Sequence, residues 1–288
     1  MTETTTAAPE NGDAPARPII RLDGVGKNFG NITALAGVTL SVSAGQVTCI
    51  LGDNGAGKST LIKIVAGLYA HDTGAYVVDG AEVRLSSPRE ALDLGIATVY
   101  QDLAMVPLMP VWRNFFLGSE LRTGPRPFRR LDVRRMRAIT DEELKKMGID
   151  LPDIEQPVGN LSGGQRQVVA IARAVYFGAR VLILDEPTAA LGVKQSGVVL
   201  KYIAAARGAG LGVVFITHNP HHAFMVGDHF AVLKLGRVEL DAPRAELDLE
   251  DLTHHMSGGA ELDTLKHELE RTESPQVAPL HAPAPRES

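Results

Sequence analysis

The chain is short of cysteine, aromatic residues, basic charge and long apolar runs, and each shortage excludes a class of protein. Cys49 is the only cysteine among 288 residues, so an intramolecular disulfide is impossible and a reducing compartment is favoured. No apolar run approaches the roughly 20 residues of a membrane-spanning helix, and residues 1–18 lack the apolar core of a secretory signal. The net charge of −5 supplies no basic field for nucleic acid. We therefore expect a soluble, cytosolic protein.

The aliphatic content, in contrast, is ample for a folded domain. Apolar residues make up 44% of the chain and charged residues 22%, which excludes a wholly disordered or fibrous protein. Both ends are rich in Pro, Ala, Thr, Ser and Glu and show no apolar period. Residues 1–18 and 266–288 are therefore predicted to be disordered tails, and residues 19–265 are predicted to form the folded domain.

Short β-branched runs alternate with helical patterns inside this domain, which indicates a parallel or mixed sheet with crossover helices. Strands are expected at Ile19–Asp23, Gln46–Leu51, Ala97–Tyr100, Val181–Leu184, Gly212–Thr217 and His229–Leu233. Helices are expected to begin at Lys58, Pro88, Gly164, Lys194 and Pro220. The sequence contains no internal repeat, so the domain is a single copy of its unit.

Residues 103–160 differ from the rest because they are rich in arginine and show few strand signals. An apolar period over Val133–Met147 predicts a helix there. The arginines are Arg122, Arg126, Arg129, Arg130, Arg134, Arg135 and Arg137. They fit either an anionic partner, such as nucleic acid or lipid headgroups, or a solvated face offset by the acidic run 141–143. Phe128 is the only aromatic residue interleaved with them, which favours the solvated face.

A glycine-rich loop between an apolar run and a helical pattern carries the clearest chemical signal. It reads Gly52-Asp53-Asn54-Gly55-Ala56-Gly57-Lys58-Ser59-Thr60, which matches G-x-x-x-x-G-K-[ST] in the strand–loop–helix context that the motif requires. Such a loop curls backbone N–H groups around phosphate oxygens, and the helix N-terminus adds partial positive charge. Lys58 is expected to reach the β- and γ-phosphates of a nucleotide, and the Ser59 hydroxyl to ligate magnesium.

Two adjacent carboxylates, Asp185 and Glu186, end the apolar run Val181–Leu184. Burying charge costs several kcal/mol unless a partner is present, and a magnesium–nucleotide complex is such a partner. Asp185 would hold the magnesium and Glu186 would polarise the attacking water. Taken alone, the same residues also fit a simple turn before a helix.

A third motif, residues 161–165 (LSGGQ), offers a hydroxyl and backbone N–H groups at a helix start, a second phosphate-binding end. Together with GDNGAGKST before it and LDEP after it, LSGGQ closely resembles the ATP-binding cassette (ABC) ATPases, and the resemblance covers residues 19 to about 240. It implies an α/β fold of the P-loop NTPase class. In that fold a mixed-sheet core is joined by an antiparallel β subdomain and a helical subdomain at about residues 103–160.

The resemblance further implies ATP hydrolysis with ATP and Mg²⁺ in a head-to-tail homodimer. The residues that would close over the partner's ATP are Ser162, Gly163, Gly164 and Gln165. Phe29 matches the aromatic residue that stacks on adenine, although a core phenylalanine would look the same. Gln101 matches the glutamine that ligates magnesium and senses the γ-phosphate, and His218 matches the switch histidine on that phosphate. Gly192 departs from the family, which more often has Asp there.

Within this family, the chain most resembles ATP-binding subunits of bacterial importers of ribose, xylose and fructose. The segments that carry this resemblance are residues 113–121, 186–195 and 217–228. This resemblance implies a sugar-import ATPase on the cytoplasmic face of the membrane, partnered by permease subunits and indirectly by a sugar-binding protein. Residues 103–117 are too apolar for a free loop. The resemblance implies that they form the groove for the permease's coupling helix, and part of the run must also belong to the helical subdomain's own core. An ABC ATPase acting on nucleic acid or the ribosome, and an importer of another solute, remain the alternatives; no basic surface or tandem cassette favours the former.

Overall fold

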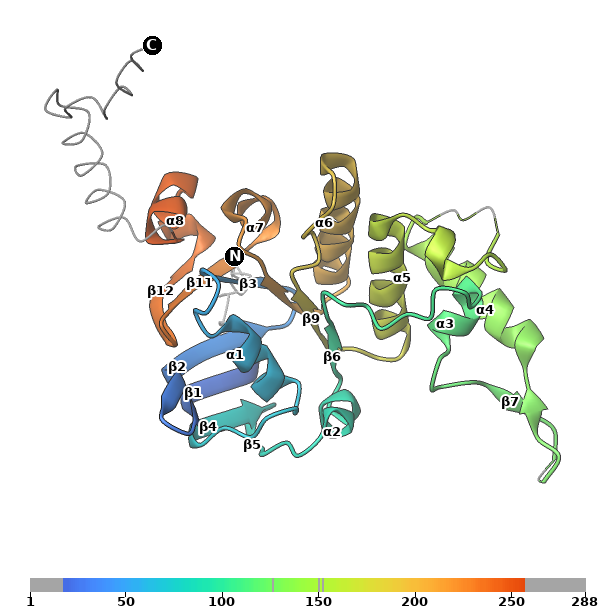
Figure 1. Ribbon diagram of the computed structural model, residues 1–288, viewed down its shortest axis with the longest axis horizontal. Coiled ribbons are helices and arrows are strands. Elements are labelled where there is room, and N and C mark those ends of the chain that lie inside the picture. Colours follow the sequence, from blue (N-terminus) through green and yellow to red (C-terminus); the bar gives the residue numbers. More distant parts are fainter. Residues whose placement is uncertain (1–17, 126, 150, 152, 257–288) are drawn as a thin grey trace, which may run out of the picture.

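The computed structural model describes residues 18–125, 127–149, 151 and 153–256. Figure 1 shows a central sheet with helices above it, an antiparallel sheet below it on one side, and a helical region on the other side. This is the mixed-sheet fold with an antiparallel and a helical part that the sequence led us to expect. Pro18 already belongs to the first strand, one residue earlier than predicted, whereas residues 1–17 and 257–288, including most of both predicted tails, lie outside the described part.

The central sheet has six strands in the order β12-β11-β3-β10-β9-β6. Their bounds are β3 Val47–Leu51, β6 Ile96–Val99, β9 Val181–Asp185, β10 Gly212–Ile216, β11 His229–Lys234 and β12 Arg237–Pro243. All neighbours are parallel except β11 and β12, which are antiparallel. Because parallel strands share a direction, β3, β6, β9 and β10 end at one edge, and the loops that follow them meet there.

Apart from the edge strand β12, the strands of this sheet are buried on both faces, which explains their nearly continuous apolar sequences. Leu182 and Leu184 of β9 face a core that helices complete, whereas Val181 and Ile183 face a second core under the antiparallel sheet. The helices that contribute to the first core include α5 Gly163–Tyr176, α6 Val193–Gly208, α7 Pro220–Val226 and α8 Leu249–Met256. Alternate side chains of β9 are therefore buried in two different cores, one on each face of the sheet.

The antiparallel sheet, in the order β2-β1-β4-β5, forms the second layer. It contains β1 Pro18–Phe29, β2 Ile32–Ser43, β4 Thr73–Val78 and β5 Ala81–Glu82. The helix α1, Lys58–Val65, contributes Leu61 and Ile62 to the core between the two sheets. The short α2, Pro88–Asp93, leads into β6. This layer fixes α1, and with it the glycine-rich loop, against the strand ends.

The helical region is built from α3 Val111–Phe115, α4 Val133–Lys146 and the 3₁₀ turn Val158–Asn160. Two-residue strands that the sequence did not predict, β7 Arg122–Thr123 and β8 Arg130–Leu131, make a small hairpin before α4. Val111, Phe115 and Phe116 are fully buried in the first core, whereas Leu103 and Met105 are only partly buried. The apolar run 103–117 thus divides between core and surface, a division that the sequence left open.

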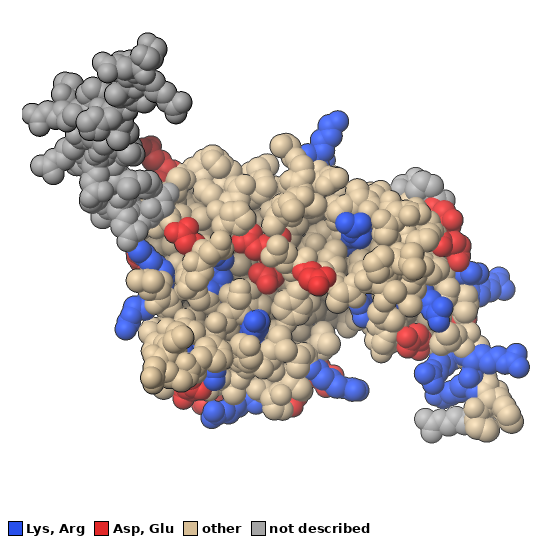
Figure 2. All heavy atoms as spheres, in the orientation of Figure 1, with Lys and Arg blue, Asp and Glu red and all other residues tan. Residues whose placement is uncertain are grey.

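The arginines of this region gather around β7 and the start of α4 (Figure 2). The acidic run 141–143 does not offset them, contrary to our sequence interpretation, because it pairs with Lys145 and Lys146 one turn later on the same helix. Arg137 is the exception among the arginines, since it forms an ion pair with Glu155 and lies over the Trp112 ring. Helical i,i+4 geometry decided this pairing in favour of the lysines.

The predicted elements are confirmed closely. Each expected strand is present to within two residues except the first, which extends to Phe29, and α1, α2 and α7 begin at the predicted residues. The helices α5 and α6 each begin one residue earlier than predicted. Within the described residues, no helix combines the length and apolar character that crossing a membrane requires.

Candidate active site

A cleft of about 430 Å³ lies where the glycine-rich loop meets the ends of the central strands. The loop lines it with Lys58 and Ser59, the segment after β6 with Gln101, and the end of β9 with Asp185 and Glu186. The fold thus brings together at one edge of the sheet five side chains that the sequence singled out separately.

The glycine-rich loop has its shape because two of its glycines are indispensable. Gly52 has a φ of 140°, and a Cβ there would collide with the carbonyl oxygen of Leu233. Gly57 has a φ of 108°, and its Cβ would lie 2.8 Å from the Leu35 side chain. Both conformations belong to a region that L side chains avoid. The loop is therefore pinned between β11 and β2, with the N-terminus of α1 directed at the cleft.

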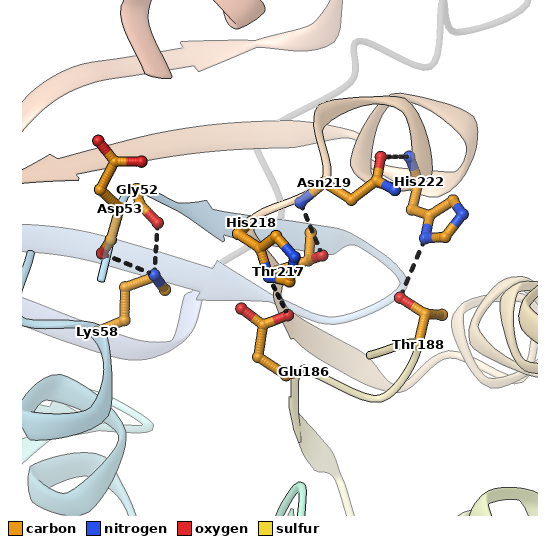
Figure 3. A network of polar contacts seen from close by, with 9 residues as sticks. All are labelled: Gly52, Asp53, Lys58, Glu186, Thr188, Thr217, His218, Asn219 and His222. Atoms are coloured by element: carbon orange, nitrogen blue, oxygen red, sulfur yellow. Dashed lines mark hydrogen bonds and ion pairs between the residues drawn. The ribbon is translucent and has the colours of Figure 1, made fainter. Parts of the chain in front are cut away.

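Lys58 is buried at the start of α1 and folds back over its own loop (Figure 3). Its Nζ donates hydrogen bonds to the carbonyl oxygens of Gly52 and, at 3.0 Å, Asp53. These acceptors are neutral, so the ammonium charge remains available to an anion in the cleft. The phosphate contact expected of Lys58 from the sequence stays a prediction.

Asp185 and Glu186 stand where β9 runs beside β10. Burial raises the pKa of Asp185, and the adjacent Glu186 carboxylate raises it further, while Lys58 and Lys63 oppose the shift. Glu186 adopts a left-handed backbone with φ 49°, and its N–H donates to the carbonyl of Ile216 at 3.0 Å. A non-glycine residue held in this region is strained, which is characteristic of functional positions.

His218 follows β10 and faces Glu186 across the cleft rim (Figure 3). Its Nδ1 lies 2.9 Å from Glu186 Oε2. The two side chains differ in exposure, 62% for His218 and 14% for Glu186, so the carboxylate is sheltered and the imidazole reaches into solvent. No local feature of the sequence predicts this contact, because 32 positions separate the residues. It arises from the pairing of β9 with β10.

Ser162 to Gln165 form the start of α5. The Ser162 hydroxyl accepts from the N–H of Gln165 at 3.2 Å, and Gln165 Oε1 accepts from the N–H of Ser162 at 2.9 Å, a reciprocal capping box. Gly163 and Gly164 lie against Leu191 and Gln195, too close for larger residues without rearrangement. Among the described residues that line the 430 Å³ cleft, none comes from 162–165. The motif therefore lies outside the cleft of its own glycine-rich loop.

Phe29 is the last residue of β1 and pairs with Ile32, which lines the cleft together with Thr33 and Ala34. Its ring is 42% exposed and packs edge-to-face on Tyr69, with the centroids 5.4 Å apart. A phenylalanine exposed to this degree is not a core residue, so the structural alternative raised from the sequence is wrong.

Other residues lining the cleft were missed from the sequence, namely Ile32–Ala34, Leu235 and Gly236. Gly236 closes over Ala34, since a Cβ there would lie 2.6 Å from the Ala34 carbonyl oxygen. The turn between β11 and β12 has positive φ at both Leu235 and Gly236, and a Leu-Gly pair carries no motif that would have found it. Only the contact between the two sheets makes it part of the site.

Gly192 is the N-cap of α6 and offers no side chain to the helix. Its backbone is extended, a Cβ there would meet open space, and the first turn of α6 contains no acidic residue. Gly192→Asp is therefore expected to raise the free energy of unfolding by about 0.5 kcal/mol, measured by urea denaturation. Gly192→Ala is the control, because it adds a Cβ without an acceptor, and equal stabilisation by both variants would contradict the capping explanation.

Residues 35–189 match the family described as ABC transporter. The chain belongs to the ABC transporter ATP-binding family. As a member it is an ATP-binding, ATP-hydrolysing cassette. Its solved neighbours agree on the fold: a nucleotide-free cassette of an ABC transporter superposes with a TM-score of 0.70 at 24% identity, covering 82% of this chain and 96% of that one. A dimeric bacterial ABC transporter cassette, MJ0796, superposes with a TM-score of 0.66 at 28% identity, covering 78% and 98%.

Curated relatives of the cassette carry names of sugar importers. The chain is 42% identical over 242 residues to the xylose/arabinose import ATP-binding protein XylG of Sulfolobus acidocaldarius, covering 84% of this chain and 95% of that protein. It is 40% identical over 248 residues to the fructose import ATP-binding protein FrcA of Rhizobium meliloti, covering 85% and 95%. It is also 41% identical to the ribose import ATP-binding protein RbsA 2 of Rubrobacter xylanophilus, covering 86% of this chain but only 48% of that protein.

Proposed function

We propose that this cassette is the ATP-hydrolysing subunit of a monosaccharide importer. The observation that carries the ATPase part is the single cleft that gathers Lys58, Ser59, Gln101, Asp185 and Glu186. The sugar part rests on the relatives named for import of xylose and arabinose, fructose and ribose. We assign the cassette to residues 19–265, with residues 103–160 as its helical subdomain.

The phosphates of ATP would lie against the glycine-rich loop. Residues 53–55 and 57–60 line that end of the cleft, and the N-terminus of α1 adds positive charge there. Lys58 would exchange the neutral carbonyls of Gly52 and Asp53 for phosphate oxygens, which accept stronger, charge-assisted hydrogen bonds. Phe29 would stack on adenine, next to the Ile32–Ala34 wall of the cleft.

Magnesium fits the donor set at the inner end of the cleft. The Ser59 hydroxyl, the Gln101 amide and the Asp185 carboxylate all line it and all offer oxygen, the ligand that a hard cation prefers. Asp185 in particular is a half-buried carboxylate whose pKa is raised by burial, so a divalent cation would relieve the cost of its charge. When bound, the ion would neutralise charge on the phosphates.

Glu186 is our candidate for the group that polarises the attacking water. It is sheltered, lines the cleft and points toward His218, which would hold the γ-phosphate. A base positioned at the reacting water contributes roughly 10²–10⁴ in rate. The left-handed backbone of Glu186 directs its side chain to this place.

Ser162–Gln165 would act on the ATP of a second copy in a head-to-tail homodimer. The motif does not line the cleft of its own loop, yet the start of α5 presents a hydroxyl and backbone N–H groups suited to phosphate. The fold neighbour MJ0796 is a dimeric cassette. Each ATP would then contact Lys58 of one copy and Ser162 of the other.

The permease would bind at a separate groove of about 290 Å³ between α2, β6 and α5. Leu103, Met105, Ala174 and Phe177 give it a mostly apolar lining, which suits the apolar face of a short helix. Gln101 lies two residues from Leu103, so occupancy of the groove can influence the nucleotide cleft. Bound in this way, the cassette would lie on the cytoplasmic face of the membrane, and a sugar-binding protein would act from the other side.

Reconstitution with a candidate permease of a monosaccharide importer tests this proposal. We expect the purified chain to release phosphate from ATP only when Mg²⁺ is present, and proteoliposomes containing permease and cassette to take up a monosaccharide in an ATP-dependent manner. Omitting the cassette is the control and should stop uptake. Phosphate release without sugar uptake would refute the sugar assignment alone, whereas no release under any condition would refute the ATPase assignment.

A further inference from the structure

The loops that carry Glu186 and His218 are joined by a second contact farther from the cleft (Figure 3). Thr188 Oγ1 and His222 Nδ1 share a hydrogen bond at 3.1 Å. Thr188 follows Glu186 by two residues and is only 6% exposed, and His222 follows His218 by four residues. The segment after β9 and the segment after β10 are therefore joined by two side-chain contacts, Glu186 with His218 at the cleft and Thr188 with His222 farther from it.

The His222 end of this contact is held by the start of α7. Asn219 caps the helix, since its Oδ1 accepts from the N–H of His222 at 3.1 Å, and its own N–H donates to Thr217 Oγ1 at 3.1 Å. Pro220 fixes the first helical residue. Burial, followed by the charges of His221 and His218, lowers the pKa of His222, so its imidazole is neutral at pH 7 and suited to a hydroxyl partner.

The Thr188 end is held by the turn after β9. The N–H of Ala189 donates to the carbonyl of Glu186 at 3.0 Å, and the N–H of Glu186 donates to Ile216 at the end of β10. Glu186 between them has the strained left-handed backbone. Such a conformation persists only where surrounding contacts impose it. A hydrogen bond at buried Thr188 supplies one such contact on the far side of the strained residue.

From this geometry we propose that Thr188 and His222 are positioning residues for hydrolysis. A single contact between Glu186 and His218 leaves the two loops able to rotate about it, whereas two contacts in parallel fix both the distance and the orientation. Neither Thr188 nor His222 lines the cleft, so they act through the placement of Glu186 and His218. This inference rests on the proposed roles of those two residues.

Two substitutions at Thr188 separate positioning from packing. Thr188→Val keeps the side-chain shape and removes the hydroxyl, whereas Thr188→Ser keeps the hydroxyl and removes a methyl group. We expect Thr188→Val to lower kcat for ATP about tenfold to hundredfold with KM changed less than about twofold, because small misplacements of reacting groups have effects of this size. Thr188→Ser should retain most of the kcat. The opposite order would show that the residue matters only for packing and would overturn the proposal.

A double-mutant cycle supplies the second readout. His222→Ala should reproduce the loss in kcat, and the Thr188→Val/His222→Ala double variant should be no slower than the slower single variant, since both remove one contact. His221→Ala is the matched control, because this exposed neighbour lies on the same helix turn. Thermal unfolding and ATP affinity are measured for every variant to show that each is folded and binds nucleotide.

The outcomes distinguish this inference from the proposed function. If the wild-type chain hydrolyses ATP and both Thr188→Val and His222→Ala match it, the positioning role is refuted while the ATPase assignment stands. Additive losses in the cycle would also refute it, because they would show two independent effects. If the wild-type chain does not hydrolyse ATP, the proposed function itself fails.

Discussion

Replacing Glu186 with Gln is expected to lower kcat for ATP hydrolysis by at least about hundredfold while ATP remains bound. The amide keeps the size of the side chain and its place 2.9 Å from His218, but it cannot accept a proton from water. A positioned general base contributes roughly 10²–10⁴ in rate, so its loss dominates turnover. Removing one of two adjacent negative charges should leave nucleotide affinity equal or somewhat tighter.

Phosphate release and the dissociation constant for ATP, measured on the same preparation, test this expectation. Glu246→Gln provides a matched control, because it removes one carboxylate from an exposed 3₁₀ turn that does not line the cleft. We expect the control to hydrolyse ATP at the wild-type rate. Hydrolysis by Glu186→Gln at that rate would show that another group activates the water, whereas lost ATP binding would show that Glu186 is part of the binding surface.

Lys58→Met is expected to weaken ATP binding by about two orders of magnitude. Methionine keeps an unbranched, buried stem at the start of α1 but removes the ammonium group. Hydrogen bonds to charged groups contribute about 1.5–3 kcal/mol each, and a tenfold change corresponds to about 1.4 kcal/mol. The carbonyls of Gly52 and Asp53 would also lose their donor, so the loop itself should become less ordered.

Isothermal titration with ATP and Mg²⁺ measures this loss directly. Lys201→Met is the matched control, since it removes the same charge from an exposed position on α6 and should bind ATP as the wild type does. Equal loss in both variants would point to a general effect of net charge. An unchanged affinity of Lys58→Met would remove Lys58 from the phosphate site.

Contiguous motifs were predictable because the chemistry they serve is local. Residues 52–60 lie between a strand and a helix, and backbone conformation alone makes them a loop that can surround an anion. The helix start after Ser162 was likewise indicated by a hydroxyl before a helical run, and the structure adds that Ser162 and Gln165 form a capping box there. Strands such as Val181–Asp185 were recognisable because burial on both faces leaves a continuous apolar run.

Long-range contacts were not predictable in the same way. The Leu235-Gly236 turn became part of the cleft only because β11 lies beside β3 and the antiparallel sheet covers it. The contact between His222 and Thr188 was not predictable either, because 34 positions separate the two residues and only the placement of α7 brings them together.

The sequence alone determined the fold class and, through the resemblance to ABC ATPases, the ATPase chemistry that we expected. The evidence was the shortage of cysteine, the absence of long apolar runs and the order of the three motifs. These conclusions were possible because each strand, helix start and motif is encoded within a few consecutive residues by local hydrogen bonding and by the spacing of apolar side chains. The tertiary structure decided which strand ends meet, that Glu186 faces His218, and that residues 162–165 lie outside their own cleft. Strand order and helix packing join residues that are far apart in the chain, and no short segment contains that information.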